Sequence, residues 1–131
     1  MKNLPLIFSA IIIGLICYQS IFIAPLINEL LSSNDASIIL RSLWPKFFLM
    51  IFIISLITFL TIVIFNKQKN IAKYLSLVSG LLMFSCYFLV PIINNAKDIA
   101  NENLWLILHL ITIIITFITL IINIALIKFW K

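Results

Sequence analysis

Charged residues are scarce in this chain, with four acidic and nine basic residues among 131. Charged residues make up 10% of the sequence and apolar residues 64%, and the mean hydropathy is +1.26. A soluble globular domain is about a quarter charged and about half apolar. So few charges exclude an ordinary water-soluble domain.

Glycine, cysteine and histidine are also rare, with two, two and one copies. The sequence contains no glycine-rich phosphate loop, Ser/His/Asp set, HExxH or CxxC. Its acids are too few for paired-carboxylate catalysis. These absences disfavour an enzyme, so we predict no catalytic residue, no cofactor and no metal site.

The sulfur-containing residues suggest one alternative to that prediction. Cys17, Met83, Cys86 and His109 are copper-type ligands by chemistry, but the histidine is expected near the membrane surface and the sulfurs deeper. Both cysteines lie in apolar stretches, which is typical of small buried hydrophobic residues rather than of a disulfide framework. A single histidine also excludes bis-histidine haem within one chain.

Four long stretches without charge dominate the sequence. Each holds at least about 20 residues, enough to cross the hydrocarbon core of a bilayer as a helix. The spans are predicted at about residues 4–28, 44–65, 72–94 and 104–127. The expected fold is therefore an all-α integral membrane four-helix bundle in a single domain.

The stretch between the first two predicted spans has features of a helix of its own. Ser33-Asn34-Asp35 offers N-caps, and four apolar side chains with Arg41 among them follow by residue 43. We expect a short helix on the membrane surface at about residues 35–43. Pro45 would begin the second span, since proline is tolerated in a first helical turn.

The basic residues are distributed unevenly over the two sides of these spans. One side holds six of the nine, at Lys2, Lys67, Lys69, Lys73, Lys128 and Lys131. The other side holds the remaining three together with all four acids. The positive-inside rule then places both termini in the cytoplasm, so the basic residues orient the protein and do not indicate nucleic-acid binding. The wealth of Ile, Asn, Lys and Phe, whose codons are A/T-rich, favours a bacterial cytoplasmic (inner) membrane.

A shift of 66 residues aligns one half of the chain with the other. It matches residues 22–28 with 88–94, including Pro25 with Pro91, and it matches Gly14 with Gly80. Small residues four positions before the glycines complete two small-xxx-small motifs, which let helices approach closely in lipid. We therefore expect two parallel two-helix repeats, with tight packing between the first and third spans.

The fourth span carries a polar stripe. His109, Thr112, Thr116, Thr119 and Asn123 fall within an arc of about 80° on a helix. Such a stripe must face protein or water, because unsatisfied polar groups are costly in hydrocarbon. Either the threonines bond back to their own helix and the stripe packs, or it lines a binding pocket or pathway. His109 is open to a structural or a functional role.

Further polar residues are expected at the outer ends of the spans, near His109. Asn28 and Asn94 follow the two prolines and could donate to carbonyls that proline leaves free. Glu29 is expected in the same leaflet. If the protein has a site, the sequence predicts it at this outer end.

Several of these features occur together in a known family. The first span has Gly14 and ends in Ala24-Pro25-Leu26, and the third ends in Tyr87 and Pro91. Other motif positions are Ala36, the aromatic-rich entry at 43–48, Trp105, Leu108, His109 and Thr112, where the family has serine. In these motifs the chain resembles the transmembrane protein 205-like family, bacterial four-span proteins of unknown function.

The resemblance implies four spans and a membrane location, and it makes Pro25 and His109 family features. The chain departs from the family pattern near Asn28, where the usual phenylalanine after the first proline is absent. The resemblance implies no reaction, substrate or cofactor.

Three interpretations of function follow. The chain is a non-enzymatic accessory or partner-binding membrane protein, a small oligomeric transporter or permeation element using the stripe of the fourth span, or a metal- or haem-linked redox protein, which the ligand count disfavours. The expected partners are the lipid bilayer and a homo-oligomer or larger membrane complex.

Overall fold

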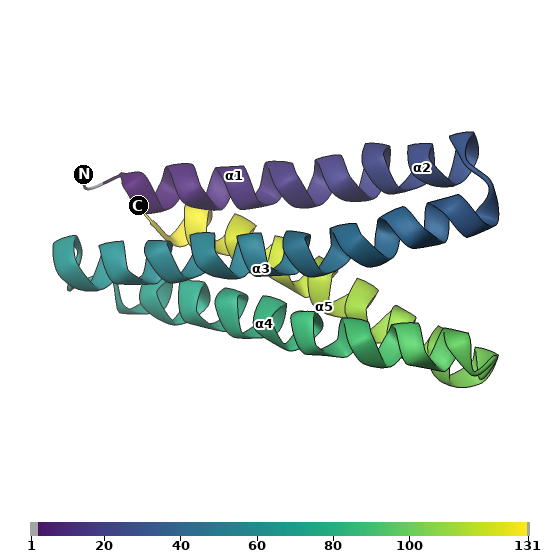
Figure 1. The fold of residues 1–131 in the computed structure, drawn as a ribbon. Helices are drawn as coiled ribbons and strands as arrows, with labels where there is room; N and C mark the ends of the chain where they lie inside the picture. Colours follow the sequence, from purple (N-terminus) through teal and green to yellow (C-terminus); the bar gives the residue numbers. More distant parts are fainter. Residues whose placement is uncertain (1–2, 131) are drawn as a thin grey trace.

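The computed structural model describes residues 3–130, and every secondary-structure element in this range is a helix (Figure 1). The elements are α1 (Leu4–Tyr18), the π-helix η1 (Gln19–Ile23), α2 (Ala24–Leu30), α3 (Ser33–Phe65), α4 (Asn70–Asp98) and α5 (Glu102–Phe129). The first three form one continuous rod over Leu4–Leu30, which we call the first rod. The predicted four-helix bundle is thereby confirmed.

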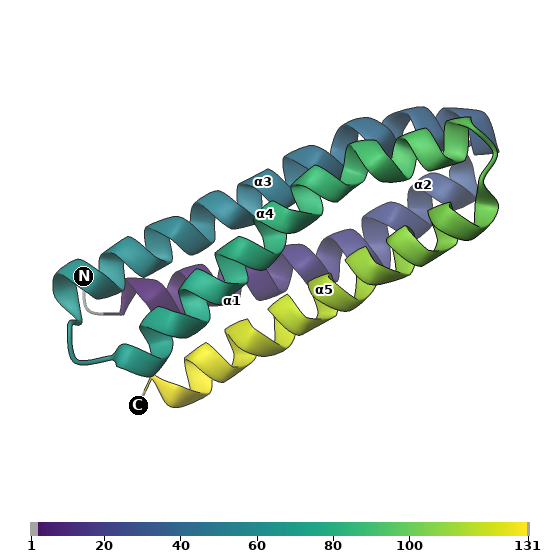
Figure 2. The same ribbon diagram turned by 90° about the horizontal axis from the view of Figure 1, so that it is seen from below.

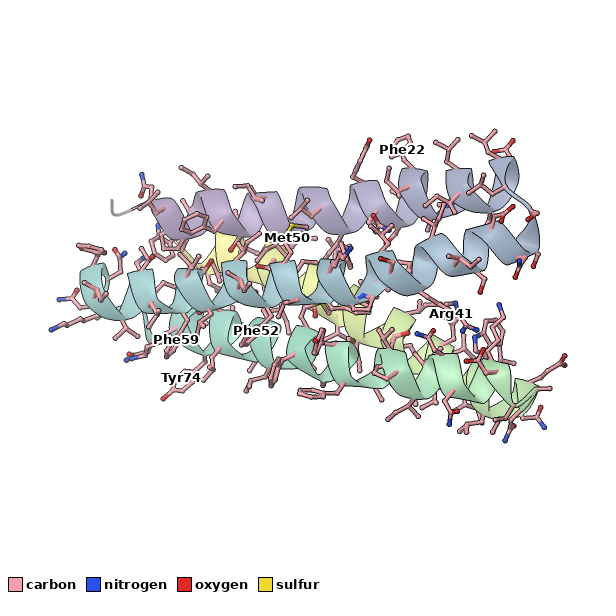
Figure 3. The ribbon with its side chains drawn as sticks, in the orientation of Figure 1. Phe22, Arg41, Met50, Phe52, Phe59 and Tyr74 are labelled. Carbon is pink, nitrogen blue, oxygen red and sulfur yellow. The ribbon has the colours of Figure 1, made fainter. Side chains whose placement is uncertain are left out.

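All four rods are long and apolar enough to cross a membrane, at 27 to 33 residues each. At 1.5 Å per residue, each exceeds the hydrocarbon core of about 30 Å. Large apolar side chains point outward along the bundle, such as Phe22 at 61% and Tyr74 at 65% exposure (Figure 3). The chain is an integral membrane protein, because only lipid suits such a surface. Lys2 and Lys131, two of the residues used for its predicted orientation, lie outside the described range.

Short loops connect the helices, which therefore alternate in direction, and both chain ends lie at one end of the bundle (Figures 1 and 2). We call this the terminal end, and the end with the turns at residues 31–32 and 99–101 the distal end. The first rod contacts α3 and α5, and α4 contacts the same two helices. The described helices thus form a ring in the order first rod, α3, α4, α5.

This ring corrects the prediction that the first and third spans pack tightly. They lie diagonally, and no Cα atoms of α1 and α4 come within 8 Å. Gly80 instead faces α3, where an added Cβ would meet the Ser55 Cβ at 3.4 Å. An added Cβ at Gly14 would meet nothing within 4 Å. Helices joined by a short loop pack side by side. The first rod and α4 are each the first helix of a hairpin, and they therefore lie across the bundle from each other.

The prediction of a separate surface helix at residues 35–43 is also wrong. This segment is helical, but it forms the first part of α3, and Pro45 lies inside that helix rather than at its start. Ser32 caps the helix by accepting the Asp35 N–H at 3.2 Å. Near the proline, Trp44 stacks on Phe48, and Phe47 meets Trp44 edge to face and Phe48 at a tilt. Their burial against the core offsets the backbone hydrogen bond that Pro45 cannot make.

Two apolar clusters fill the bundle, one on each side of a polar contact. The larger includes Ile12, Ile51 and Met83, and the smaller, at the terminal end, includes Ile62 and Leu126. The polar contact joins three helices through Ser55 of α3, Ser79 of α4 and Asn123 of α5. The two serine hydroxyls lie 3.1 Å apart, and Asn123 Nδ2 donates to Ser79 Oγ at 2.9 Å and to the Thr119 carbonyl at 2.9 Å.

We expect Ser79→Ala to lower the free energy of unfolding by about 1 kcal/mol, in line with interhelical hydrogen bonds measured in membranes. The substitution removes the acceptor of Asn123 and the partner of Ser55. Ser85→Ala is the matched control, because this exposed hydroxyl of α4 donates only to the Leu82 carbonyl of its own helix. Unfolding in mixed detergents, followed by circular dichroism, measures both. Equal effects of the two substitutions would contradict the assigned role.

Candidate functional site

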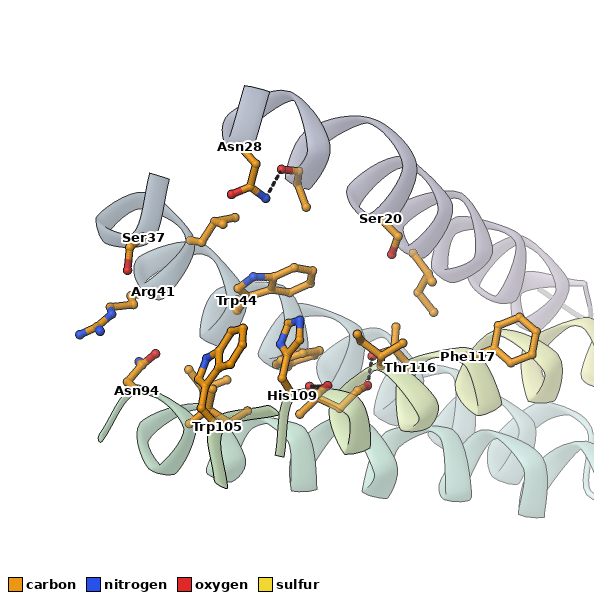
Figure 4. Close-up of a pocket in the computed structure, with 18 of the residues that line it drawn as sticks. Ser20, Asn28, Ser37, Arg41, Trp44, Asn94, Trp105, His109, Thr116 and Phe117 are labelled. Atoms are coloured by element: carbon orange, nitrogen blue, oxygen red, sulfur yellow. Dashed lines mark hydrogen bonds between the residues drawn. The ribbon is translucent and has the colours of Figure 1, made fainter. Parts of the chain in front are cut away.

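A cavity of about 640 Å³ lies in the distal half of the bundle, lined by side chains of all four rods. The first rod contributes residues from Ile16 to Asn28, and α5 contributes residues from Trp105 to Leu120. The remaining walls come from Ser37 to Phe48 of α3 and Val90 to Lys97 of α4. Figure 4 shows the side chains that converge on this space.

The cavity exists because the first rod and α5 diverge toward the distal end. At the terminal end α1 lies against α5, but no Cα atom of η1 or α2 comes within 8 Å of α5. Figure 1 shows the two helices separating along the bundle. Since α2 still contacts α3, the sideways opening lies between the first rod and α5.

The π-helix η1 lies at this divergence. Its C-terminal end leads directly into Pro25, which has no N–H to donate and whose ring crowds the carbonyl four residues earlier. The wider π-turn accommodates that crowding by inserting one extra residue, and such turns are frequent at functional sites. Ser20 and Ile21 of η1 line the cavity. The sequence does not predict this turn, since the equivalent Pro91 lies within a continuous α-helix.

Aromatic rings surround the polar part of the cavity. The His109 ring stacks on Trp105, with centroids 5.2 Å apart and planes 8° apart. On α3, Trp44 faces the same space (Figure 4). The Lys97 ammonium lies over the Trp105 ring, 5.3 Å from its centroid. This stack holds His109 by contacts within α5, while the ring stays half-buried at the cavity wall.

Charged and amide side chains form the distal rim. Arg41 of α3 donates to Asp98 of α4 at 2.6 Å, which joins two helices at the mouth of the cavity. Asn28 Nδ2 donates to the Ala24 carbonyl at 3.0 Å, one turn back in its own helix. Asn94 and Lys97 of α4 complete the rim. Arg41, Lys97 and both tryptophans were not among the predicted site residues, and the two cations were interpreted only as part of the charge distribution that orients the chain.

The polar stripe of α5 divides into two parts. Thr112 donates to the His109 carbonyl and Thr116 to the Thr112 carbonyl, both at 2.7 Å, yet both side chains line the cavity. Thr119 donates to the Ile115 carbonyl at 2.9 Å, and Asn123 belongs to the interhelical contact described above. The two interpretations of the stripe are therefore compatible, because a threonine satisfied by its own helix can still present its methyl group to a cavity.

The structure brings most of the predicted polar residues together. His109, Thr112, Thr116, Asn28 and Asn94 all line the cavity, whereas Glu29 is exposed and does not. The residues predicted for helix packing, Gly14, Gly80, Pro25 and Pro91, do not line it either.

The four copper-type ligands are divided between two places. Cys17 and His109 line the cavity, while Met83 and Cys86 belong to the apolar core. Among residues 3–130, no three His, Cys, Asp or Glu side chains are grouped closely enough to hold a metal ion.

We expect His109→Gln to change the free energy of unfolding by less than about 1 kcal/mol. Within the described range its side chain stacks only on Trp105, one turn away in the same helix, and such pairs contribute a few tenths of a kcal/mol. Asn123→Ala, which breaks a contact between helices, serves as the destabilising reference. Thermal unfolding in detergent compares the two. Loss of folded protein in the His109 variant would assign this residue a structural role.

The comparisons with known proteins identify a family for this chain. No curated protein and no solved structure matches it. A family described as Domain of unknown function (DUF4149) matches residues 7–102. This range covers the first rod from residue 7 onward together with α3 and α4, including Pro25, Pro91 and the Arg41–Asp98 pair, and it ends before His109. The chain belongs to the DUF4149 family of unknown function.

Proposed function

We propose that this protein acts without chemistry of its own, as a non-enzymatic membrane protein that holds an amphipathic molecule in the distal cavity. The observation that carries the proposal is the cavity itself. Its volume of about 640 Å³ falls within the range of about 300–1,000 Å³ typical of small-molecule sites. Its walls are mainly apolar, and its charged and amide groups gather at one end. An amphipathic molecule matches both parts.

The exposure of the cavity walls indicates how such a molecule would enter. Three apolar residues line the cavity and are also exposed on the bundle surface: Ile21 at 62%, Ile113 at 51% and Phe117 at 60%. They lie on the two facing edges of the divergence between the first rod and α5. This surface meets hydrocarbon in a membrane, so the cavity opens sideways toward lipid as well as toward the distal end.

The same geometry favours binding over permeation. The lining extends no further toward the terminal end than Ile16, Phe48 and Leu120. Beyond it the two apolar clusters and the Ser55–Ser79–Asn123 contact fill the bundle. A pathway across a single copy would have to cross this packed half, so the transport interpretation would require an oligomer. The redox interpretation has no observation of the site in its favour.

The relation to the transmembrane protein 205-like family is also a proposal. Gly14, Ala24-Pro25-Leu26, Tyr87 and Pro91 support it, together with the Trp105 to Thr112 motif of the fourth span. The family match to residues 7–102 leaves that last motif outside its range.

A pair of variants tests the binding function. Ala24→Trp should reduce the amount of co-purified long-chain amphiphile at least severalfold, because the new ring fills the cavity from the first rod. Leu26→Trp is the matched control, since Leu26 is 48% exposed and does not line the cavity. Extraction of each protein from mild detergent, followed by mass spectrometry of the bound lipids, gives the comparison. The binding function is wrong if both variants retain as much amphiphile as the wild type.

We also propose that the protein lies in a bacterial cytoplasmic membrane with both termini in the cytoplasm. The excess of lysines at the terminal end supports this orientation. Reporters fused after residue 131 should then show green-fluorescent-protein emission and no alkaline phosphatase activity. Fusions after residue 100 should show the opposite pattern. Phosphatase activity from the fusion after residue 131 would reverse the proposed orientation.

A further inference from the structure

We infer that the molecule held in the cavity is an anionic phospholipid of the surrounding membrane, with its phosphate at Arg41 and Lys97 and one acyl chain inside the bundle. This inference rests on the proposed binding function and names its ligand. The observation that supports it is that the charged side chains lie at one end of the cavity and the apolar walls extend away from them.

The charged side chains that line the cavity have one sign. Among the described residues of its walls, Arg41 and Lys97 are cationic and none is a carboxylate. The nearby acid, Asp98, is bound through one terminal nitrogen of Arg41, and a guanidinium carries five N–H donors in all. Arginine therefore has donors left for phosphate, which it binds in a forked geometry, and lysine adds a second positive charge.

The arrangement around these cations suits a phosphate at a membrane interface. The Arg41 side chain is 34% exposed, and Lys97 lies on the exposed face of the distal end. Lys97 lies over the Trp105 ring, and Trp44 lines the cavity together with Arg41. Tryptophans of this kind lie at headgroup level. The Asn94 amide lines the same rim and forms no hydrogen bond with another described side chain. It can therefore donate to a phosphate or glycerol oxygen.

The apolar part of the cavity has the length of one leaflet. Along α5 the lining beyond the aromatic stack runs from His109 to Leu120, which is about 16 Å at 1.5 Å per residue. Half of the hydrocarbon core measures about 15 Å. An acyl chain can thus lie along α5 beside Ile113 and Phe117, while the sideways opening leaves the second chain of the lipid in the bilayer.

The experiment is a lipid titration of the purified full chain in a neutral detergent, read by native mass spectrometry. Phosphatidylglycerol and phosphatidylcholine with identical acyl chains are compared. A basic side chain near a membrane surface favours anionic lipid by roughly fivefold, so we expect a preference for phosphatidylglycerol of about that size or more. Arg41→Gln and Lys97→Gln should each reduce it several-fold. Lys46→Gln, a charge change on α3 that does not line the cavity, should leave it unchanged.

Asp98→Asn separates an electrostatic role of the pair from a structural one. If Arg41 serves to bind phosphate, removal of the competing carboxylate should increase the preference for phosphatidylglycerol. If the Arg41–Asp98 pair only holds α3 against α4, the variant should lose lipid or leave the preference unchanged, and the inference fails. Gel filtration confirms that each variant remains folded.

The remaining outcomes keep this inference distinct from the proposed function. Equal binding of the two lipids, with both blocked by Ala24→Trp, would overturn the anionic ligand and retain the binding function. Binding of neither lipid would overturn the inference, while the proposed function would still be decided by the amphiphile that co-purifies with the wild type and with Ala24→Trp. Displacement of phosphatidylglycerol by millimolar inorganic phosphate alone would also overturn the inference, because the site would then recognise a free anion rather than a lipid.

Discussion

Polar groups inside hydrocarbon must find partners within the protein, and this requirement governs the structure of the bundle. It makes every described element a helix, since a helix satisfies its own backbone. It also explains the placement of side chains. Thr112 and Thr116 bond back to α5, while Ser55, Ser79 and Asn123 satisfy one another between three helices. At the distal end the first rod and α5 separate, and polar and charged side chains surround a cavity.

The 66-residue repeat of the sequence relates the first rod to α4 and α3 to α5. In the ring, each of these related pairs lies on a diagonal of the bundle. The equivalent prolines differ, however. Pro25 follows a π-turn, whereas Pro91 lies within a continuous α-helix. Beyond the π-turn the first rod and α5 separate, whereas α4 contacts both of its neighbours, and the cavity opens between the first rod and α5.

The proposed site is built from tryptophans and basic residues, which in most membrane helices only position the protein in the bilayer. Tryptophans at span ends ordinarily anchor a protein at the interface, and basic residues ordinarily orient it. Here Trp44, Trp105, Arg41 and Lys97 surround one cavity, and His109 stacks on Trp105 among them. The same interfacial chemistry that positions the protein in a bilayer can therefore recognise a single molecule of that bilayer.

The sequence by itself determined the four apolar spans and the polar stripe of α5, because these depend on local composition and helical periodicity. It also gathered Asn28, Asn94 and His109 at one end, since equal span lengths bring matching positions to the same depth. Only the tertiary structure decided that Gly80 packs on α3 and that residues 35–43 continue into α3. It alone showed that Arg41 and Lys97 line a cavity. Periodicity specifies a face of one helix, whereas neighbours, crossing angles and the space between helices depend on all four at once.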